Sequence, residues 1–186
     1  ASKEENYKDA FNLATMLEKL YFFPAPTMAF VQGSAYGGGV GLIACCDIVL
    51  AHEKAQFALT EVKLGIIAAT IMPYILKAIG TRQAMRYCLS AEIISEKKKK
   101  KVGLVHQLAD SEEFDEKSNN LLKQIMLGGK EAHRETKRLI FDLTCNIDPT
   151  IMKQVTASRI AERRASPEAK EGLNAFLEKR PPSWIA

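Results

Sequence analysis

Apolar residues follow two different patterns over the first part of the chain. Ser2 and Glu5 have the spacing of a capping box and precede a stretch with helical periodicity. Its apolar residues fall on one helical face, at Tyr7, Ala10, Phe11, Ala14, Leu17, Leu20 and Tyr21. Continuous short apolar runs at 27–32, 47–51 and 104–108 instead predict buried strands. The patterns therefore predict one long helix followed by strands that are separated along the chain.

The segments between these strands predict helices and one irregular strand. Residues 40–46 are apolar throughout and suit a buried helix, whereas 55–67 indicates a broken strand followed by a turn at Gly65. Two helices are expected over 71–79 and 81–90. Strands that alternate with helices are typical of an α/β fold with a mostly parallel sheet.

Residues 111–179 are helical in pattern, with breaks at Gly128-Gly129 and near Pro149 and Pro167. This change of pattern divides the chain into an α/β part, 1–110, and a helical part, 111–186. Three or four strands would leave an apolar sheet edge uncovered, so we expect further strands to precede this sequence in the complete protein.

Composition and cysteine usage narrow the class of protein. The chain has 186 residues, enough for one sizeable core, and about half of them are apolar. No apolar run reaches the roughly 18 residues of a membrane span, and the polar first ten residues do not form a signal peptide. The cysteines, Cys45, Cys46, Cys88 and Cys145, lack metal-binding spacing, and the histidines are scattered. We expect reduced thiols, a cytoplasmic location and no metal.

The formal charge of +4 is modest, and the run Glu96–Lys101 could account for most of it. Such a run is usually a solvated helix face, and we favour that interpretation. The alternative is a patch that attracts the phosphates of a nucleotide cofactor or of RNA.

Three consecutive glycines, Gly37 to Gly39, interrupt the most apolar stretch of the chain. A strand, a glycine turn and a helix together direct backbone N–H groups outward at a helix N-terminus, which favours a phosphate or the oxyanion of a reacting carbonyl. Both common nucleotide-binding glycine motifs are poor matches here. Close packing of helix on strand would also need glycine, and the spacing alone does not choose between the two interpretations.

Several motifs, in order along the whole chain, resemble those of the crotonase (enoyl-CoA hydratase/isomerase) superfamily. They are VQGSAYGGGVGLIACCDIVLA, AQFALTEVKLGII, AIGTRQAMRYCLSAE, VGLVHQL and GLNAFLEKRPPSW. Within the family the sequence is most similar to the bacterial methylglutaconyl-CoA hydratases, with isohexenylglutaconyl-CoA hydratases second. The resemblance implies a ClpP/crotonase-like ββα spiral core and a helical C-terminal region that builds homotrimers, commonly paired into hexamers.

The resemblance covers roughly the last two-thirds of such a protein. Crotonases begin with strands that carry a first oxyanion donor in a G-A-D-type motif, and nothing like it occurs in this sequence. This agrees with the expectation, from the strand count, that an N-terminal segment precedes it.

The same resemblance implies a catalytic site. Gly38 would donate its N–H to the thioester oxygen of an acyl-CoA, with Gly37 beside it, and Glu61 would move the proton as acid and base. Tyr36 would contact the acyl chain or belong to the core, and Lys179 would reach the coenzyme A nucleotide. Coenzyme A would enter only as the thioester carrier, with no other cofactor.

One position departs from the pattern of well-studied hydratases, which place a second glutamate where this chain has Gly41. Two carboxylates would share a water, whereas one carboxylate suits isomerisation of a 3-enoyl-CoA. The space at Gly41 could instead admit a branched acyl group. We therefore predict hydration of a 2-enoyl-CoA, favouring methylglutaconyl-CoA of leucine breakdown, with isomerase as the alternative. A non-enzymatic alternative is an RNA-binding homologue that uses the lysine run.

Overall fold

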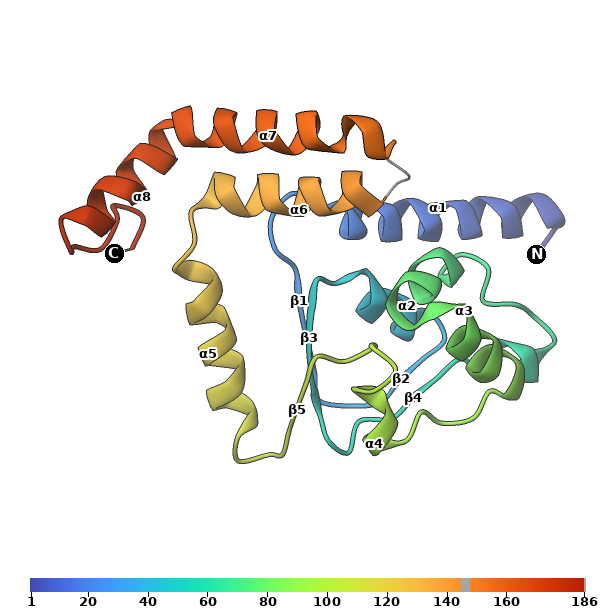
Figure 1. The fold of residues 1–186 in the computed structure, drawn as a ribbon. Coiled ribbons are helices and arrows are strands. Elements are labelled where there is room, and N and C mark those ends of the chain that lie inside the picture. Colours follow the sequence, from blue (N-terminus) through green and yellow to red (C-terminus); the bar gives the residue numbers. More distant parts are fainter. Residues whose placement is uncertain (145–147, 186) are drawn as a thin grey trace. The chain divides into compact units, whose positions relative to one another are not determined.

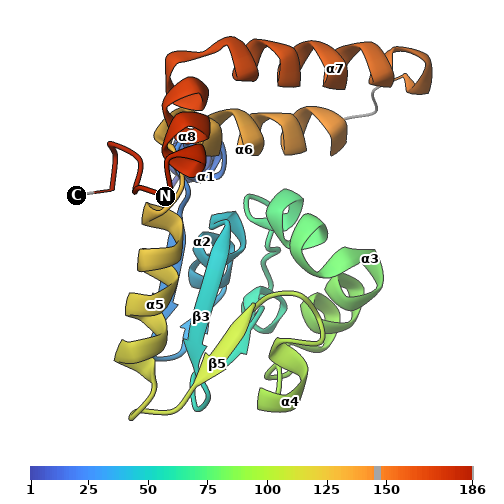
Figure 2. The same ribbon diagram turned by 60° about the vertical axis from the view of Figure 1, so that its left-hand side comes forward.

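The computed structural model describes residues 1–144 and 148–185, which form two compact units. The first unit comprises residues 1–23 and 27–118, and the second comprises residues 24–26 and 119–186. Figures 1 and 2 show the first as strands with surrounding helices and the second as helices alone. Each unit is described by itself below.

Helix α1, Lys3–Tyr21, begins with the predicted capping box. The Glu5 N–H donates to Ser2 Oγ at 3.1 Å, and the Ser2 N–H donates to the Glu5 carboxylate at 2.6 Å. Of the predicted apolar face, Leu17 is fully buried, whereas Tyr7 and Phe11 are 69% and 59% exposed. The periodicity therefore identified the helix and its start, but only its C-terminal half packs into the core of the first unit.

The central sheet consists of β1, Met28–Val31, β3, Ile48–His52, and β5, Gln107–Ala109. They are parallel, with β3 in the middle, and Met28 pairs with Ile48. This confirms the predicted parallel α/β architecture. The strand predicted over 104–108 begins later, at Gln107. Leu104 and Val105 lie in irregular backbone and are each 2% exposed. Their apolar character reflects burial in the core rather than strand pairing.

A second, two-stranded sheet holds the glycine turn. It pairs β2, Ala35–Tyr36, in parallel with β4, Phe57–Ala58. Helix α2, Gly38–Cys45, follows β2 directly, and a 3₁₀ helix, Glu61–Leu64, follows β4 and ends at Gly65 in the left-handed region. The parallel pairing therefore brings the start of α2 next to the segment that leads into Glu61.

Helix α3, Met72–Ser90, contains the two helices predicted on either side of Gly80. Gly80 has a φ of 72° and interrupts the helical geometry, so the break is confirmed. Helix α2 packs against both α1 and α3 in this unit.

The lysine run departs from the prediction of a solvated face at one residue, Lys99. Helix α4, Glu96–Lys99, is a single turn, and Lys99 is 2% exposed. Its ammonium donates to the Glu53 carbonyl at 2.6 Å and lies 5.5 Å from the centroid of the Phe57 ring. A buried ammonium needs such partners, so Lys99 is a packed residue, while Lys98, Lys100 and Lys101 are exposed.

Cys45 and Cys88 are free thiols, and Cys145 lies outside the described residues. Burial, with a smaller effect of neighbouring Cys46, raises the pKa of the Cys45 thiol to about 12. No helix in the described part of the chain has both the length and the apolar composition needed to cross a bilayer.

The second unit is built from the end of α5, Phe114–Met126, and from α6, Lys130–Thr144, α7, Pro149–Ala165, and α8, Pro167–Leu177. The breaks fall at Gly128-Gly129, Pro149 and Pro167, as predicted, because proline is tolerated in the first turn of a helix. Helices α6 and α7 lie side by side in both views, and an ion pair between Asp142 and Arg159 joins them (Figures 1 and 2).

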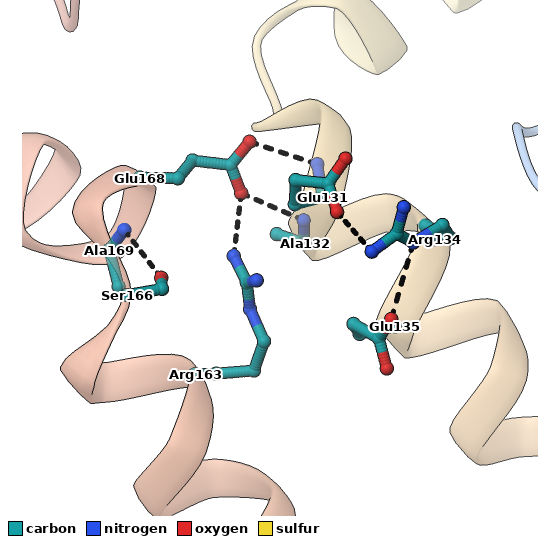
Figure 3. A network of polar contacts seen from close by, with 8 residues as sticks. All are labelled: Glu131, Ala132, Arg134, Glu135, Arg163, Ser166, Glu168 and Ala169. Atoms are coloured by element: carbon teal, nitrogen blue, oxygen red, sulfur yellow. Dashed lines mark hydrogen bonds and ion pairs between the residues drawn. The ribbon is translucent and has the colours of Figure 1, made fainter.

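The carboxylate of Glu168 connects three of these helices (Figure 3). It accepts hydrogen bonds from the N–H groups of Glu131 and Ala132, at 2.9 and 2.8 Å, and from the Arg163 guanidinium at 2.7 Å. The N–H donors belong to the first turn of α6, where a helix leaves its amides unpaired and favours negative charge. Glu168 therefore caps α6 from α8 and neutralises a cation of α7.

We expect Glu168→Gln to lower the free energy of unfolding by about 2 kcal/mol, because a neutral amide cannot accept three charge-assisted bonds. Thermal or urea unfolding measures this. Glu162→Gln is the matched control, since Glu162 accepts one bond, from the Ser158 hydroxyl, at an exposed position. Equal stability of the two variants would contradict the assignment of Glu168 as a cap.

Candidate active site

The glycine turn places an unusual backbone at the start of α2. The Gly37 N–H donates to the Ala58 carbonyl at 3.0 Å, and Gly37 adopts φ 50° and ψ −118°, which side-chain-bearing residues rarely adopt. Gly38 is then the first residue of the helix, where N–H groups have no partner inside the helix. A Cβ built on Gly38 meets no described atom within 4 Å. The first turn of α2 therefore faces open space at Gly38.

Glu61 lies against this turn. A Cβ built on Gly37 would be 3.0 Å from Glu61 Oε1, so only glycine fits beside the carboxylate without displacing it. The other oxygen, Oε2, is buried and has no hydrogen-bond partner among the described residues. An unpaired buried carboxylate oxygen is costly in a folded protein, and such groups are common where a side chain is kept for catalysis.

Helix α3 contributes a thiol to the surroundings of Glu61. Burial, and secondarily the charge of Glu61, raise the pKa of Cys88. A raised pKa keeps this thiol protonated and poorly nucleophilic near neutral pH. Cys88 is thus a polarisable neighbour of the carboxylate, with no sign of a reactive cysteine.

The structure corrects the expectation of open space at Gly41. Gly41 is buried on α2, and a Cβ built there would lie 2.1 Å from Cγ2 and 2.7 Å from Cβ of Ile71. Ile71 itself is 1% exposed. The volume that a branched acyl group was expected to use is therefore filled by an isoleucine.

Tyr36 immediately precedes the glycine turn and is 46% exposed. Its hydroxyl donates to the Gln56 side-chain oxygen at 2.9 Å. The pairing of Tyr36 with Ala58 places both residues at the end of the two-stranded sheet. The ring is not part of the buried core, and Gln56 fixes the position of its hydroxyl.

Lys179 belongs to the second unit, two residues after α8 ends, with a left-handed φ of 57°. Its side chain is exposed, and its N–H donates to the Phe176 carbonyl at 3.2 Å. The next residue, Arg180, pairs with Glu171 and holds the pKa of that carboxylate at about 2, with a further contribution from the Ser183 N–H. This clamp fixes the turn that presents Lys179.

Sequence reasoning missed two residues near the predicted site. Ile71 gave no signal because it is one apolar residue in an apolar stretch, and only the fold places it against Gly41. Phe176 is 79% exposed one turn before Lys179. It lies beside the exposed Leu177 at the end of α8, and no pattern in the sequence singled it out.

A cavity of about 760 Å³ in the second unit is lined by residues of α6, α7 and α8 together with Trp184, and none of the predicted site residues lines it. Among residues 1–144 and 148–185, no group of three or more histidine, cysteine, aspartate or glutamate residues could hold a metal ion.

Comparison with known proteins identifies relatives over the whole length of the chain. Residues 1–186 match the family model described as enoyl-CoA hydratase/isomerase. The chain is 32% identical over 182 residues to a Thermus thermophilus protein named as an enoyl-CoA hydratase, covering 97% of this chain and 71% of that protein. It is 34% identical over 169 residues to the human mitochondrial methylglutaconyl-CoA hydratase, covering 87% of this chain and 49% of the human protein.

Solved structures share the fold. An enoyl-CoA hydratase from Shewanella pealeana superposes with a TM-score of 0.93 at 39% identity, covering 99% of this chain and 69% of that one. An enoyl-CoA hydratase/isomerase from Marinobacter aquaeolei gives a TM-score of 0.90 at 31% identity, covering 97% of this chain and 68% of that one. The chain therefore belongs to the enoyl-CoA hydratase/isomerase family, and its α/β fold is the crotonase fold that the motifs predicted.

Proposed function

We propose that this chain supplies the acid/base residue and one oxyanion donor of an enzyme that hydrates a 2-enoyl-CoA or dehydrates the product. The observation that carries the proposal is the Glu61 carboxylate beside the glycine turn, with one oxygen buried and unpaired among the described residues. A carboxylate next to a free helix N-terminus suits proton transfer close to a developing negative charge.

The proposed chemistry divides between Gly38 and Glu61. The thioester oxygen accepts a hydrogen bond from the Gly38 N–H. This hydrogen bond strengthens as negative charge builds on the oxygen, by about 3 kcal/mol for one such donor. Glu61 takes a proton from water as the water oxygen bonds to carbon 3 of the acyl chain. The same residue then delivers the proton to carbon 2, the carbon next to the thioester.

Coenzyme A would contact the second unit. The exposed ammonium of Lys179 suits a phosphate, and the exposed Phe176 ring, one turn earlier, offers a face on which a purine base can stack. Coenzyme A is the carrier of the substrate in this proposal, and no resident cofactor is required. Tyr36, held by Gln56, would border the acyl group.

For the acyl group we favour a branched glutaconyl chain, with methylglutaconyl-CoA first and isohexenylglutaconyl-CoA second. Support comes from the sequence around Gly37 to Asp47 and from the identity to the human protein of that name. We further propose a homotrimer or hexamer, as in the family. The free thiols of Cys45 and Cys88 favour a reducing compartment such as the cytoplasm.

Isomerisation of a 3-enoyl-CoA is the second candidate, because Gly41 leaves the site with one carboxylate from this chain. Isomerisation moves a proton from carbon 2 to carbon 4 and needs only one base. The two reactions therefore differ in whether oxygen from water enters the product.

Oxygen labelling separates these two functions. The full-length protein is supplied with methylglutaconyl-CoA and, separately, with a linear 3-enoyl-CoA in ¹⁸O-water, and products are analysed by mass spectrometry. We expect ¹⁸O on carbon 3 of the methylglutaconyl product. Rapid conversion of the 3-enoyl substrate with no label from either one would reject hydration in favour of isomerisation.

A further inference from the structure

Gly37, the N-cap residue of α2, and Gly41 lie one turn apart at the start of this helix. The Gly41 N–H donates to the Gly37 carbonyl at 3.2 Å, as residues four apart in a helix do. Gly37 faces the carboxylate of Glu61, and Gly41 faces the side chain of Ile71. Glu61 therefore lies against the N-cap of α2, and Ile71 lies against the helix one turn later, at Gly41.

Ile71 excludes any side chain at position 41. The built Cβ lies 2.1 Å from Ile71 Cγ2 and 2.7 Å from Ile71 Cβ, and real Cβ atoms do not approach other atoms that closely. Ile71 belongs to the buried cluster and is 1% exposed, so its surroundings leave little room to move. A side chain at position 41 and the side chain of Ile71 would therefore occupy the same volume.

The direction of helical side chains indicates where a side chain in this volume would extend. The Cα–Cβ bond of a helical residue leans toward the helix N-terminus, so a long side chain at position 41 would extend back over the turn that contains Gly37. Glu61 Oε1 lies beside that turn. A carboxylate on residue 41 would thus approach the carboxylate of Glu61.

We infer that Ile71 is a specificity-determining residue that holds this site to a single carboxylate, because its side chain occupies the volume through which a second would reach Glu61. The inference rests on the proposed role of Glu61. It also predicts that substituting Gly41 alone does not install a second acid/base group.

A double-mutant cycle in the full-length protein tests the shared volume. We expect Gly41→Glu to lower Tm by about 10 °C through overpacking and burial of charge. Ile71→Gly removes both clashing atoms and should restore at least half of this loss. Ile71→Val loses only Cδ1 and keeps both clashing atoms, Cβ and Cγ2, so it should restore none. Equal rescue by glycine and valine, or an unchanged Tm for Gly41→Glu, would overturn the inference.

Two companion variants keep the cycle interpretable. Gly41→Ala carries the same clash without a charge, so it replaces Gly41→Glu in the cycle if the latter does not fold. Gly39→Ala is the matched control on α2, because its Cβ would lie 3.4 Å from the Ala35 Cβ, an ordinary contact. Its Tm should change by no more than about 2 °C.

The specificity role has its own measurement. In the folded Gly41→Glu/Ile71→Gly protein, the ratio of hydration to double-bond migration should rise about tenfold, since two carboxylates can share the acid and base steps. An unchanged ratio would reject Ile71 as a determinant of specificity. If the parent protein performs neither reaction, the proposed function fails, and the Tm cycle still tests the shared volume.

Discussion

Replacing Glu61 with glutamine is expected to lower kcat of the full-length protein by about 10² or more. Glutamine keeps the size of the side chain beside Gly37 but cannot take a proton. Because Oε2 has no hydrogen-bond partner among the described residues, the change breaks no described bond to that oxygen. The free energy of unfolding should therefore be nearly unchanged. Turnover of a 2-enoyl-CoA, followed together with thermal unfolding, separates the two effects.

Glu113→Gln is the control for this experiment. Glu113 is an exposed glutamate of the same unit that pairs with Lys117. Its replacement should leave kcat unchanged and should alter the free energy of unfolding by no more than about 0.5 kcal/mol. If Glu61→Gln turned over substrate as fast as the parent, Glu61 would not be the acid/base residue. If the variant instead lost activity together with its fold, the role of Glu61 would be structural.

The helices and breaks of this protein follow from local rules, and so most of them could be predicted. The capping box of Ser2 and Glu5, the break at Gly80 and the first-turn prolines Pro149 and Pro167 each act within a few residues. The strand β2 escaped prediction because it has two residues and exists only through its pairing with β4.

The proximity of Glu61 to the glycine turn is a tertiary result. Nothing in the spacing of Gly37 and Glu61 along the chain places them together, and family resemblance alone pointed to the pair. The structure supplies the physical reason, which is the parallel pairing of Tyr36 with Ala58 just before each residue. Both chain segments then leave the sheet at the same end.

Burial of individual side chains was the least predictable property. Lys99 belongs to a run of charged residues, yet it packs over Phe57 because the Glu53 carbonyl is available to accept a hydrogen bond from its ammonium. Ile71 and Gly41 form a single packing unit although they are far apart in the sequence. In both cases the fold determines the packing partner, and the pattern of neighbouring residues in the sequence does not predict it.

Gly38→Val is expected to lower kcat by about 10² or more while changing the Kd of free coenzyme A little. The N–H of residue 38 remains, but the valine side chain would occupy the open space in which we place the thioester oxygen. No described atom lies within 4 Å of the built Cβ, so the substitution should not disturb packing. Free coenzyme A lacks the acyl carbonyl, and its binding does not depend on this space.

Steady-state kinetics with a 2-enoyl-CoA and calorimetric titration with coenzyme A measure the two quantities separately. Gly38→Ala, with one carbon in the same space, should fall between the parent and the valine variant, whereas Gly39→Ala should match the parent because residue 39 faces Ala35. We expect kcat to fall progressively from glycine to alanine to valine at position 38, because a larger side chain fills more of the space assigned to the thioester oxygen. If coenzyme A affinity collapsed while kcat held, Gly38 would be a packing residue, and the oxyanion donor would have to lie elsewhere.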